Sequence, residues 1–170
     1  MTEDMDVLAT LKRQGMDLEA LIKQTQSGSV LILTQLLANT LEHNLIQVMQ
    51  PFKASTRKEI FRGMGPLSSL SAKIHISYGI GLLTKELYDD AHTLRAIRNK
   101  FAHAEDRLDL GSEAIAALVQ QLGTSKAGAQ PKDAISLAVE KIARHVTHAA
   151  FERTKDRAVA DEEDQTIEDD

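Results

Sequence analysis

Apolar residues recur at every third or fourth position along most of this chain, and that period fits one face of an α-helix. The last such run shows it well, with an apolar face formed by Ile135, Val139, Ile142, Val146 and Ala149. No stretch has the alternating apolar and polar residues of a half-buried strand. The pattern therefore predicts an all-α protein, a bundle of about six to seven helices.

Capping residues, prolines and glycines divide this pattern into separate elements. We expect helices over residues 5–25, 30–49, 56–64, 67–82, 84–103, 112–123 and from 131 onward. Thr56 and Glu59 have the spacing of a capping box, and Pro66 suits the first turn of the next helix. The helix over 30–49 is apolar on more than one side, so it is either central in the bundle or shared with a second subunit.

The composition excludes several kinds of protein and of site. There is no Cys, so disulfides and thiolate metal sites are ruled out. The first residues lack the basic and apolar segments of a signal peptide, and no apolar run approaches the roughly 18 residues of a membrane span. None of the common nucleotide-binding, P-loop or zinc-protease motifs is present. We therefore expect a soluble, cytoplasmic protein without a cofactor.

The net charge of −5 is unevenly distributed. Residues 161–170 hold seven acids and no base, which leaves 20 basic and 18 acidic residues in 1–160 and a net charge of +2 there. We expect 1–160 to form a single helical-bundle domain and 161–170 to be a disordered, solvated acidic tail. The alternative is that the tail mimics nucleic acid and occupies a basic surface on a partner.

Four short segments at fixed gaps carry a family resemblance. They are GPLSSLSAKI at 65–74, YGIGLL at 78–83, YDD at 88–90 and IRNKFAH at 97–103. This ordered set resembles the mannitol operon repressor family over about residues 60 to 104. The resemblance implies an all-helical protein that lowers expression of genes for mannitol uptake and metabolism. Such proteins carry no recognised DNA-reading element, and this sequence shows no helix-turn-helix signature, so the resemblance implies repression through a protein partner.

The last segment also has the Arg-x4-His form typical of the HEPN superfamily, whose helical domains are often dimeric and in some cases cleave RNA without a metal. Carried over by position, Arg98 binds phosphate, His103 acts as acid or base, and Asn99 orients the reacting group. The residue types suit that chemistry, because Arg pairs with phosphate and His can move a proton near neutral pH.

Helix geometry separates the two candidate catalytic residues. Five residues at about 100° each place Arg98 and His103 about 140° apart on a straight helix. A shared site therefore requires a kink or a second subunit. Otherwise Arg98 pairs with a carboxylate at the edge of the bundle and His103 ends its helix. Glu42 is a polar residue inside the apolar helix 30–49 and needs a partner, and we expect that partner to be Arg98.

Other polar clusters have simpler interpretations. His145 and His148 lie three residues apart on a helix, a spacing that can hold Zn²⁺, but no carboxylate pairs obviously with them, so we interpret them as surface residues and expect no metal site. The serines at 68, 69 and 71 lack the motif of a nucleophile elbow, and capping and close packing explain them.

These observations leave one preferred function and one alternative. The preferred function is a transcriptional regulator, a homodimer that acts through a protein partner, with no membrane contact. Direct reading of DNA is a third, weaker interpretation, which the net charge of +2 over residues 1–160 does not favour. The alternative is a HEPN-type domain that binds or cleaves RNA. The binding candidates are Glu42, Arg98, Asn99 and His103, and of these Arg98 and His103 are the catalytic candidates.

Overall fold

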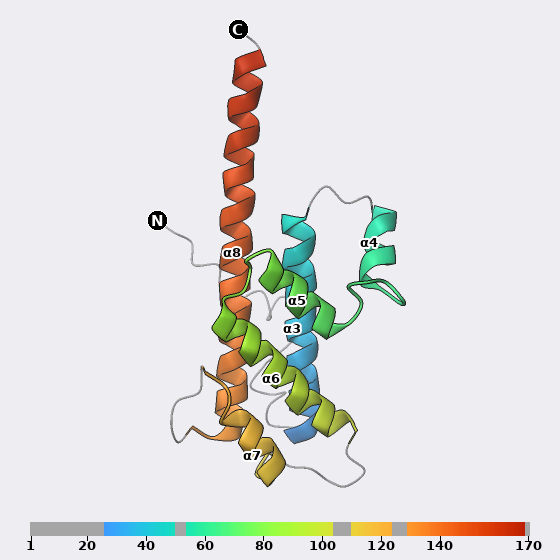
Figure 1. The fold of residues 1–170 in the computed structure, drawn as a ribbon, viewed down its shortest axis with the longest axis vertical. Helices are drawn as coiled ribbons and strands as arrows, with labels where there is room; N and C mark the ends of the chain where they lie inside the picture. The colour runs from blue at the N-terminus through green and yellow to red at the C-terminus, as the bar shows by residue number, and fades with distance from the viewer. Residues whose placement is uncertain (1–25, 50–53, 104–109, 124–128, 169–170) are drawn as a thin grey trace.

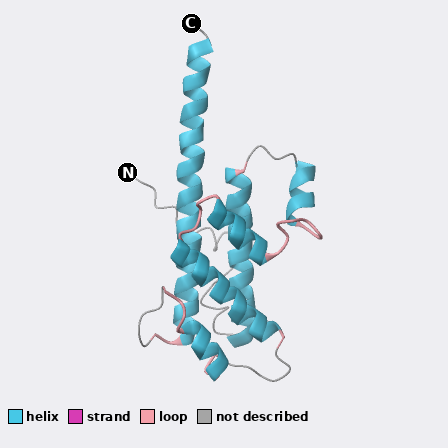
Figure 2. Cartoon of the chain, viewed as in Figure 1, coloured by secondary structure: helices cyan, strands magenta, loops and turns pink. Residues whose placement is uncertain are grey.

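The computed structural model describes residues 26–49, 54–103, 110–123 and 129–168. These ranges contain six helices and no strand (Figure 1, Figure 2). The helices are α3 (Gln26–Val48), α4 (Ala54–Phe61), α5 (Leu70–Gly79), α6 (Lys85–Ala102), α7 (Glu113–Val119) and α8 (Pro131–Glu168). The predicted all-α bundle is confirmed. The helix expected over 5–25 lies outside the described residues.

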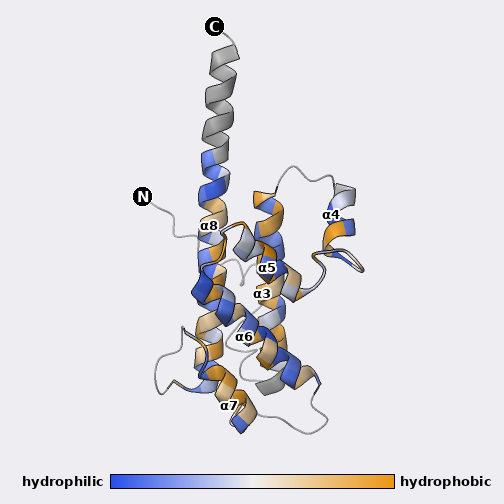
Figure 3. Cartoon of the chain, in the orientation of Figure 1, coloured by the Kyte–Doolittle hydropathy of each residue, from blue (hydrophilic) through white to orange (hydrophobic). Residues whose placement is uncertain are grey.

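The bundle is built on two long helices. α3 and α8 pack side by side and run in the same direction, while α5 and α6 cross them on one side (Figure 1). α5 packs on α3, α6 packs on both long helices, and α7 packs on α6 and α8. Figure 3 shows hydrophobic and hydrophilic residues alternating around the helices, as a bundle with one shared core requires.

α3 occupies the centre because α5, α6 and α8 all pack on it. Its leucines Leu33, Leu37, Leu41 and Leu45 are at most 3% exposed. Of the two alternatives for this helix, the central position is therefore the one that accounts for its several apolar sides. Leu31 is 36% exposed and is the large apolar residue on α3 that the bundle leaves most open.

The start of α5 lies later than the sequence suggested. Ser69 is the N-cap, and its Oγ accepts a hydrogen bond from the N–H of Ala72 at 3.1 Å. Pro66 therefore lies in the preceding turn and not in the first turn of the helix. Ser69 defines the start of the helix because its side chain accepts a hydrogen bond from one of the free N–H groups there, which a proline side chain cannot do.

The predicted starts of α6, α7 and α8 are confirmed. Thr84 is the N-cap of α6, and its Oγ1 accepts from the N–H of Leu87 at 3.3 Å. Ser112 precedes α7 and Pro131 begins α8. α7 ends at Val119 and not at Gly123, because the next residues continue as tighter turns, with the N–H of Leu122 donating to the carbonyl of Val119 at 3.1 Å.

The turn after α4 depends on two glycines. Gly63 has a φ of +56°, which residues with a Cβ rarely adopt. A Cβ on Gly65 would lie 2.2 Å from the carbonyl oxygen of Glu59, so only glycine fits there. The turn folds the chain back on α4, where the N–H of Leu67 donates to the carbonyl of Ile60 at 2.9 Å, and Arg62 and the start of α5 line one pocket. The capping box expected at Thr56 is wrong, because α4 begins at Ala54 and Thr56 lies inside it.

α8 continues to Glu168 and extends well past the rest of the bundle (Figure 1). The backbone of 161–168 is thus helical, where composition suggested a disordered tail. Starting a helix is the costly step and adding residues to one is not. The packed first half of α8 therefore accounts for a helix that continues into an acidic sequence. The division into a 1–160 domain and a tail stays a prediction.

Candidate anion-binding pocket

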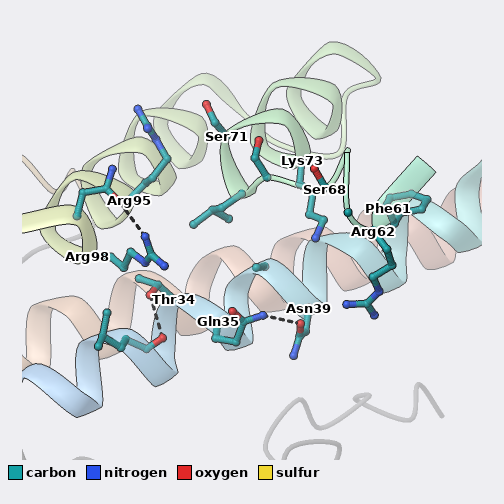
Figure 4. A pocket seen from close by; sticks show the side chains of 16 residues that line it. Thr34, Gln35, Asn39, Phe61, Arg62, Ser68, Ser71, Lys73, Arg95 and Arg98 are labelled. Atoms are coloured by element: carbon teal, nitrogen blue, oxygen red, sulfur yellow. Dashed lines mark hydrogen bonds between the residues drawn. The ribbon is translucent and has the colours of Figure 1, made fainter. Parts of the chain in front are cut away.

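A pocket of about 710 Å³ opens between α3, the turn after α4, α5 and α6 (Figure 4). Four cationic side chains line it, those of Arg62, Lys73, Arg95 and Arg98, and its lining among the described residues includes no carboxylate. In Figure 4, Arg98, Lys73 and Arg62 extend toward α3 from α6, α5 and the end of α4. Because several positive donors converge on one space, the lining favours a negatively charged ligand.

Lys73 is a buried cation on the inner face of α5. It precedes the fully buried Ile74, so the helix turns it toward α3 together with the apolar residues. Its side chain is 6% exposed, and Nζ donates to Oε2 of Glu42 at 2.8 Å. Glu42 follows Leu41 on α3 and is itself buried. Each of these two charges would be costly to bury alone, so the pair holds both in place.

Arg62 completes the pairing of Glu42. Its guanidinium lies 3.1 Å from Oε1 of Glu42, the carboxylate oxygen that Lys73 does not use. Unlike Lys73, the Arg62 side chain is 68% exposed. A guanidinium carries five N–H donors, so this contact leaves several of them free for a ligand. Glu42 therefore fixes two of the four cations from behind the pocket.

Arg98 and Asn99 lie together in the pocket wall formed by α6. Arg98 is exposed and donates to Oδ1 of Asn99 at 3.1 Å. Within the described part of the chain, no carboxylate lies at ion-pair distance from Arg98. The expected pair between Glu42 and Arg98 is wrong, because Lys73 and Arg62 occupy both oxygens of that carboxylate. One turn earlier, Arg95 has a buried Nε without a hydrogen-bond partner.

His103 lies outside this pocket. It is the C-cap of α6, its side chain is exposed, and its backbone N–H donates to the carbonyl of Asn99 at 3.1 Å. Of the four residues singled out from the sequence, the structure gathers Arg98 and Asn99 in the pocket and Glu42 directly behind it. It does not bring the His103 side chain to the same lining. A joint site for Arg98 and His103 stays a prediction that needs a second subunit.

Sequence reasoning missed Lys73, Arg62 and Arg95 as members of the site. A signal for Lys73 was present, since it lies next to Ile74 on the apolar side of its helix, where a lysine needs a counter-charge. Matching it with Glu42, the other charge inside an apolar helix, would have given the pair. Nothing in the sequence placed Arg62 there, because its position depends on the glycine turn after α4.

A second cluster of polar rings lies on α5 and α6. His75, Tyr78, Tyr88 and His92 have neighbouring ring centroids 4.5 to 5.6 Å apart. Tyr88 Oη lies 2.9 Å from Nδ1 of His75, and Tyr78 is 40% exposed. Burial lowers the pKa of His92 below its ordinary 6.5, and the positive charges of His75 and Arg95 add to this effect. The cluster combines apolar area with hydrogen-bonding groups, as protein-binding surfaces often do.

Two other kinds of site find no support in the described ranges. No group of three or more His, Asp or Glu side chains there could hold a metal ion. His148 instead lies 4.0 Å from Glu152, one turn along α8. Likewise, none of the helices that the structure describes has the length and apolarity to cross a membrane.

One of the comparisons with known proteins matches a family, and another matches a solved fold. The family model described as mannitol repressor matches residues 18–156. Among solved structures, the chain is similar to one in the X-ray structure of the MtlR–HPr complex from Escherichia coli, with a TM-score of 0.65 and 17% sequence identity. That alignment covers 76% of this chain and 94% of the other, and at this identity it shows a shared fold. No curated protein sequence matches the chain.

Proposed function

Because this chain belongs to the mannitol repressor family, we propose that it lowers transcription of mannitol genes by binding a protein partner. The family match over residues 18–156 carries this proposal, since it spans α3 to α7 and most of α8. The fold likeness to a chain of a complex between MtlR and HPr supports a protein partner and suggests its kind. We infer that an HPr-type protein is the partner here.

The aromatic cluster of His75, Tyr78, Tyr88 and His92 offers a contact surface for that partner. Exposed tyrosines with fixed ring packing bind partners well, because little side-chain freedom is lost on contact. Tyr78 meets this description, with 40% of its surface exposed and its ring packed on that of Tyr88. The ammonium of Lys85 lies over the Tyr88 ring, 5.4 Å from its centroid, and pairs with the carboxylate of Asp89, so a charged pair flanks the rings.

Calorimetric titration with purified HPr from the same cells tests both parts of the proposal. We expect binding by the wild type and affinity at least about tenfold weaker in Tyr78→Ala, the usual cost of losing an aromatic anchor. Met64→Ala is the control, because Met64 is a fully exposed apolar residue that lies in the turn after α4, away from the aromatic cluster. Absence of HPr binding at high micromolar concentration would contradict the partner, and equal losses in both variants would contradict the surface.

A cellular measurement tests the regulatory role itself. Deleting the gene should raise the transcript level of mannitol uptake genes, and restoring the wild-type chain should reverse this. Purified chain alone should not shift the control DNA of those genes at moderate salt. A specific shift that resists salt would show direct reading of DNA and overturn the proposed route.

RNA binding is the second candidate, and the open position of Arg98 favours it. Arg98 has no carboxylate partner among the described residues and lies with other cations, as a phosphate-binding arginine would. Cleavage by the HEPN-type mechanism also needs His103, which lies outside the pocket, so within one chain binding fits better than cleavage. Incubating RNA with the chain and a metal chelator tests whether the chain cleaves RNA, and a gel-shift titration with the same RNA tests whether it binds RNA. Products lost in His103→Ala would establish cleavage, and intact RNA would exclude it.

We also propose that the chain acts in the cytoplasm as a homodimer. A regulator of transcription works where the genes are, and the HEPN-type pairing of Arg98 with His103 would need a second copy. Phe151 on α8 leaves apolar area open that a second copy could cover.

A further inference from the structure

The pocket between α3, α5 and α6 has features beyond those that a protein partner requires. We propose that it binds a phosphate ester of a polyol or sugar. This site stands on the pocket geometry and does not depend on the identity of the partner. Three properties of the lining support it: its charge, its free backbone donors and its uncharged polar groups.

The charge of the pocket suits a dianion. Arg62, Lys73, Arg95 and Arg98 give four positive charges, and the carboxylate of Glu42 behind them offsets one. The exposed Arg98 has no carboxylate partner in the described structure, so its guanidinium is free to form the paired hydrogen bonds that suit a phosphate. Lys73 is held at a fixed place by Glu42 and acts as a point charge there.

The start of α5 adds backbone donors on the same side. Leu70 and Ser71 line the pocket, and the described residues provide no acceptor for their N–H groups. The Ser69 cap satisfies only the N–H of Ala72. Free N–H groups at a helix start bind phosphate oxygens well, and here the cations of the pocket surround them. The hydroxyl of Ser68 is a further donor in the lining.

The rest of the lining suits hydroxyl groups better than a nucleobase. Gln35 donates to Oδ1 of Asn39 at 3.0 Å, which leaves an amide acceptor on Gln35 and an amide donor on Asn39 for ligand hydroxyls. The aromatic residue of the lining, Phe61, is only 2% exposed and offers no surface on which a base could stack. The pocket volume of about 710 Å³ also falls in the range for small-molecule sites.

Isothermal titration of the full chain with mannitol 1-phosphate, mannitol and inorganic phosphate tests the proposal. We expect the ester to bind at least about tenfold more tightly than inorganic phosphate, because hydroxyl contacts add to the phosphate contacts. We expect mannitol alone to give no detectable binding. Arg98→Gln and Arg62→Gln should each weaken ester binding at least about tenfold, since each removes a charged donor.

The controls separate loss of the site from loss of the fold. Arg98→Gln should melt like the wild type, because Arg98 is exposed and, among the described residues, its side chain hydrogen-bonds only to Asn99. Arg144→Gln removes another exposed arginine, which pairs with Glu140 on α8, and it should leave ester binding unchanged. No heat from the ester at millimolar concentration would overturn the site. Mannitol or phosphate binding as tight as the ester would overturn the ligand class, and an RNA oligonucleotide that displaces the ester would indicate a nucleic-acid site instead.

Discussion

Glu42 holds two cations that come from distant parts of the sequence, and the structure puts all three groups within one small volume. Its oxygens lie 2.8 Å from Lys73 Nζ and 3.1 Å from the Arg62 guanidinium. The Arg62 contact is largely exposed and adds little stability by itself, whereas the Lys73 contact is buried. The burial of Lys73 therefore decides what happens when Glu42 is lost.

We predict that Glu42→Gln lowers the free energy of unfolding by about 3–5 kcal/mol, because it leaves Lys73 buried without a counter-charge. The double variant Glu42→Gln, Lys73→Met should recover most of this loss, since it removes both charges. Urea denaturation of the wild type and both variants measures the effect. A loss in the single variant no larger than that of Glu140→Gln, in an exposed pair on α8, would show that the buried pair is not needed.

His92 on α6 is a half-buried histidine within the aromatic cluster. Burial lowers its pKa below 6.5, and its Nε2 is buried without a partner in the described structure, so the folded chain resists protonation there. The unfolded chain takes up that proton first as the pH falls. The stability linked to His92 is therefore complete above pH 6.5 and is lost below it.

We predict that His92→Gln loses less stability than the wild type when the pH falls from about 7.5 to about 5.5. The His75 ring and the charges of Arg95, Asp89 and Lys85 also act on His92, so denaturation should be measured at low and high salt. His43→Gln, at an exposed position on α3, serves as the control. Parallel pH profiles for the wild type and His92→Gln would contradict the assigned cause.

The residues of the pocket show how far the sequence could predict a site. Arg98 was recognised from its motif, and the need of Glu42 for a cationic partner was recognised from its apolar surroundings. The identity of that partner was not, because it depends on how α3 and α5 are rotated against each other. Residue spacing specifies which side of one helix a side chain occupies, and it does not specify what a second helix places opposite.

Two helix starts in the described ranges are defined by single capping side chains, Ser69 for α5 and Thr84 for α6. Thr84 was predicted as the cap of α6 and forms that hydrogen bond, whereas Thr56 was predicted as a cap and lies inside α4. Both have the same side chain and a glutamate nearby, so local sequence alone did not distinguish them. The turn at Gly63 and Gly65 and the burial of Phe61 fix the end of α4, and the spacing of Thr56 and Glu59 contains neither feature.

These two threonines give a matched pair of variants. We predict that Thr84→Ala lowers the stability by about 1 kcal/mol, because the N–H of Leu87 loses its acceptor. Thr56→Ala should cost nothing measurable or add slightly to stability, since alanine suits a helix interior. Chemical denaturation of both variants tests this, and an equal loss in the two would contradict the assigned caps.

The C-terminal end of α8 projects from the bundle. Residues 161–168 continue the helix beyond the bundle, and no other described helix lies beside that end (Figure 1). We predict that deleting 161–170 leaves the melting temperature within a few degrees, because a helix end with no described helix beside it contributes little to stability. Thermal melting of the truncated chain measures this. A large drop would mean that the segment docks, on its own chain or on a second copy.

The all-α fold class followed from the sequence because the helical period, the capping residues and the prolines all indicated helices. The arrangement did not follow, since the sequence left open whether the apolar sides of 30–49 face the bundle or a second subunit. The structure covers most of them with α5, α6 and α8. The dimer therefore needs direct measurement. We predict a light-scattering mass near twice 18.7 kDa at micromolar concentration, and a value near 18.7 kDa would contradict it.

The projecting end of α8 has a consequence for how the molecule moves in water. A helix of 38 residues is about 57 Å long, and the other helices are gathered along its first half (Figure 1). Such a particle experiences more drag than a sphere of equal mass and tumbles faster about the α8 axis than across it. A single chain would leave a gel-filtration column early, as a compact dimer would. The backbone N–H groups of α8 and those of the crossing helix α6 would therefore have different NMR relaxation rates.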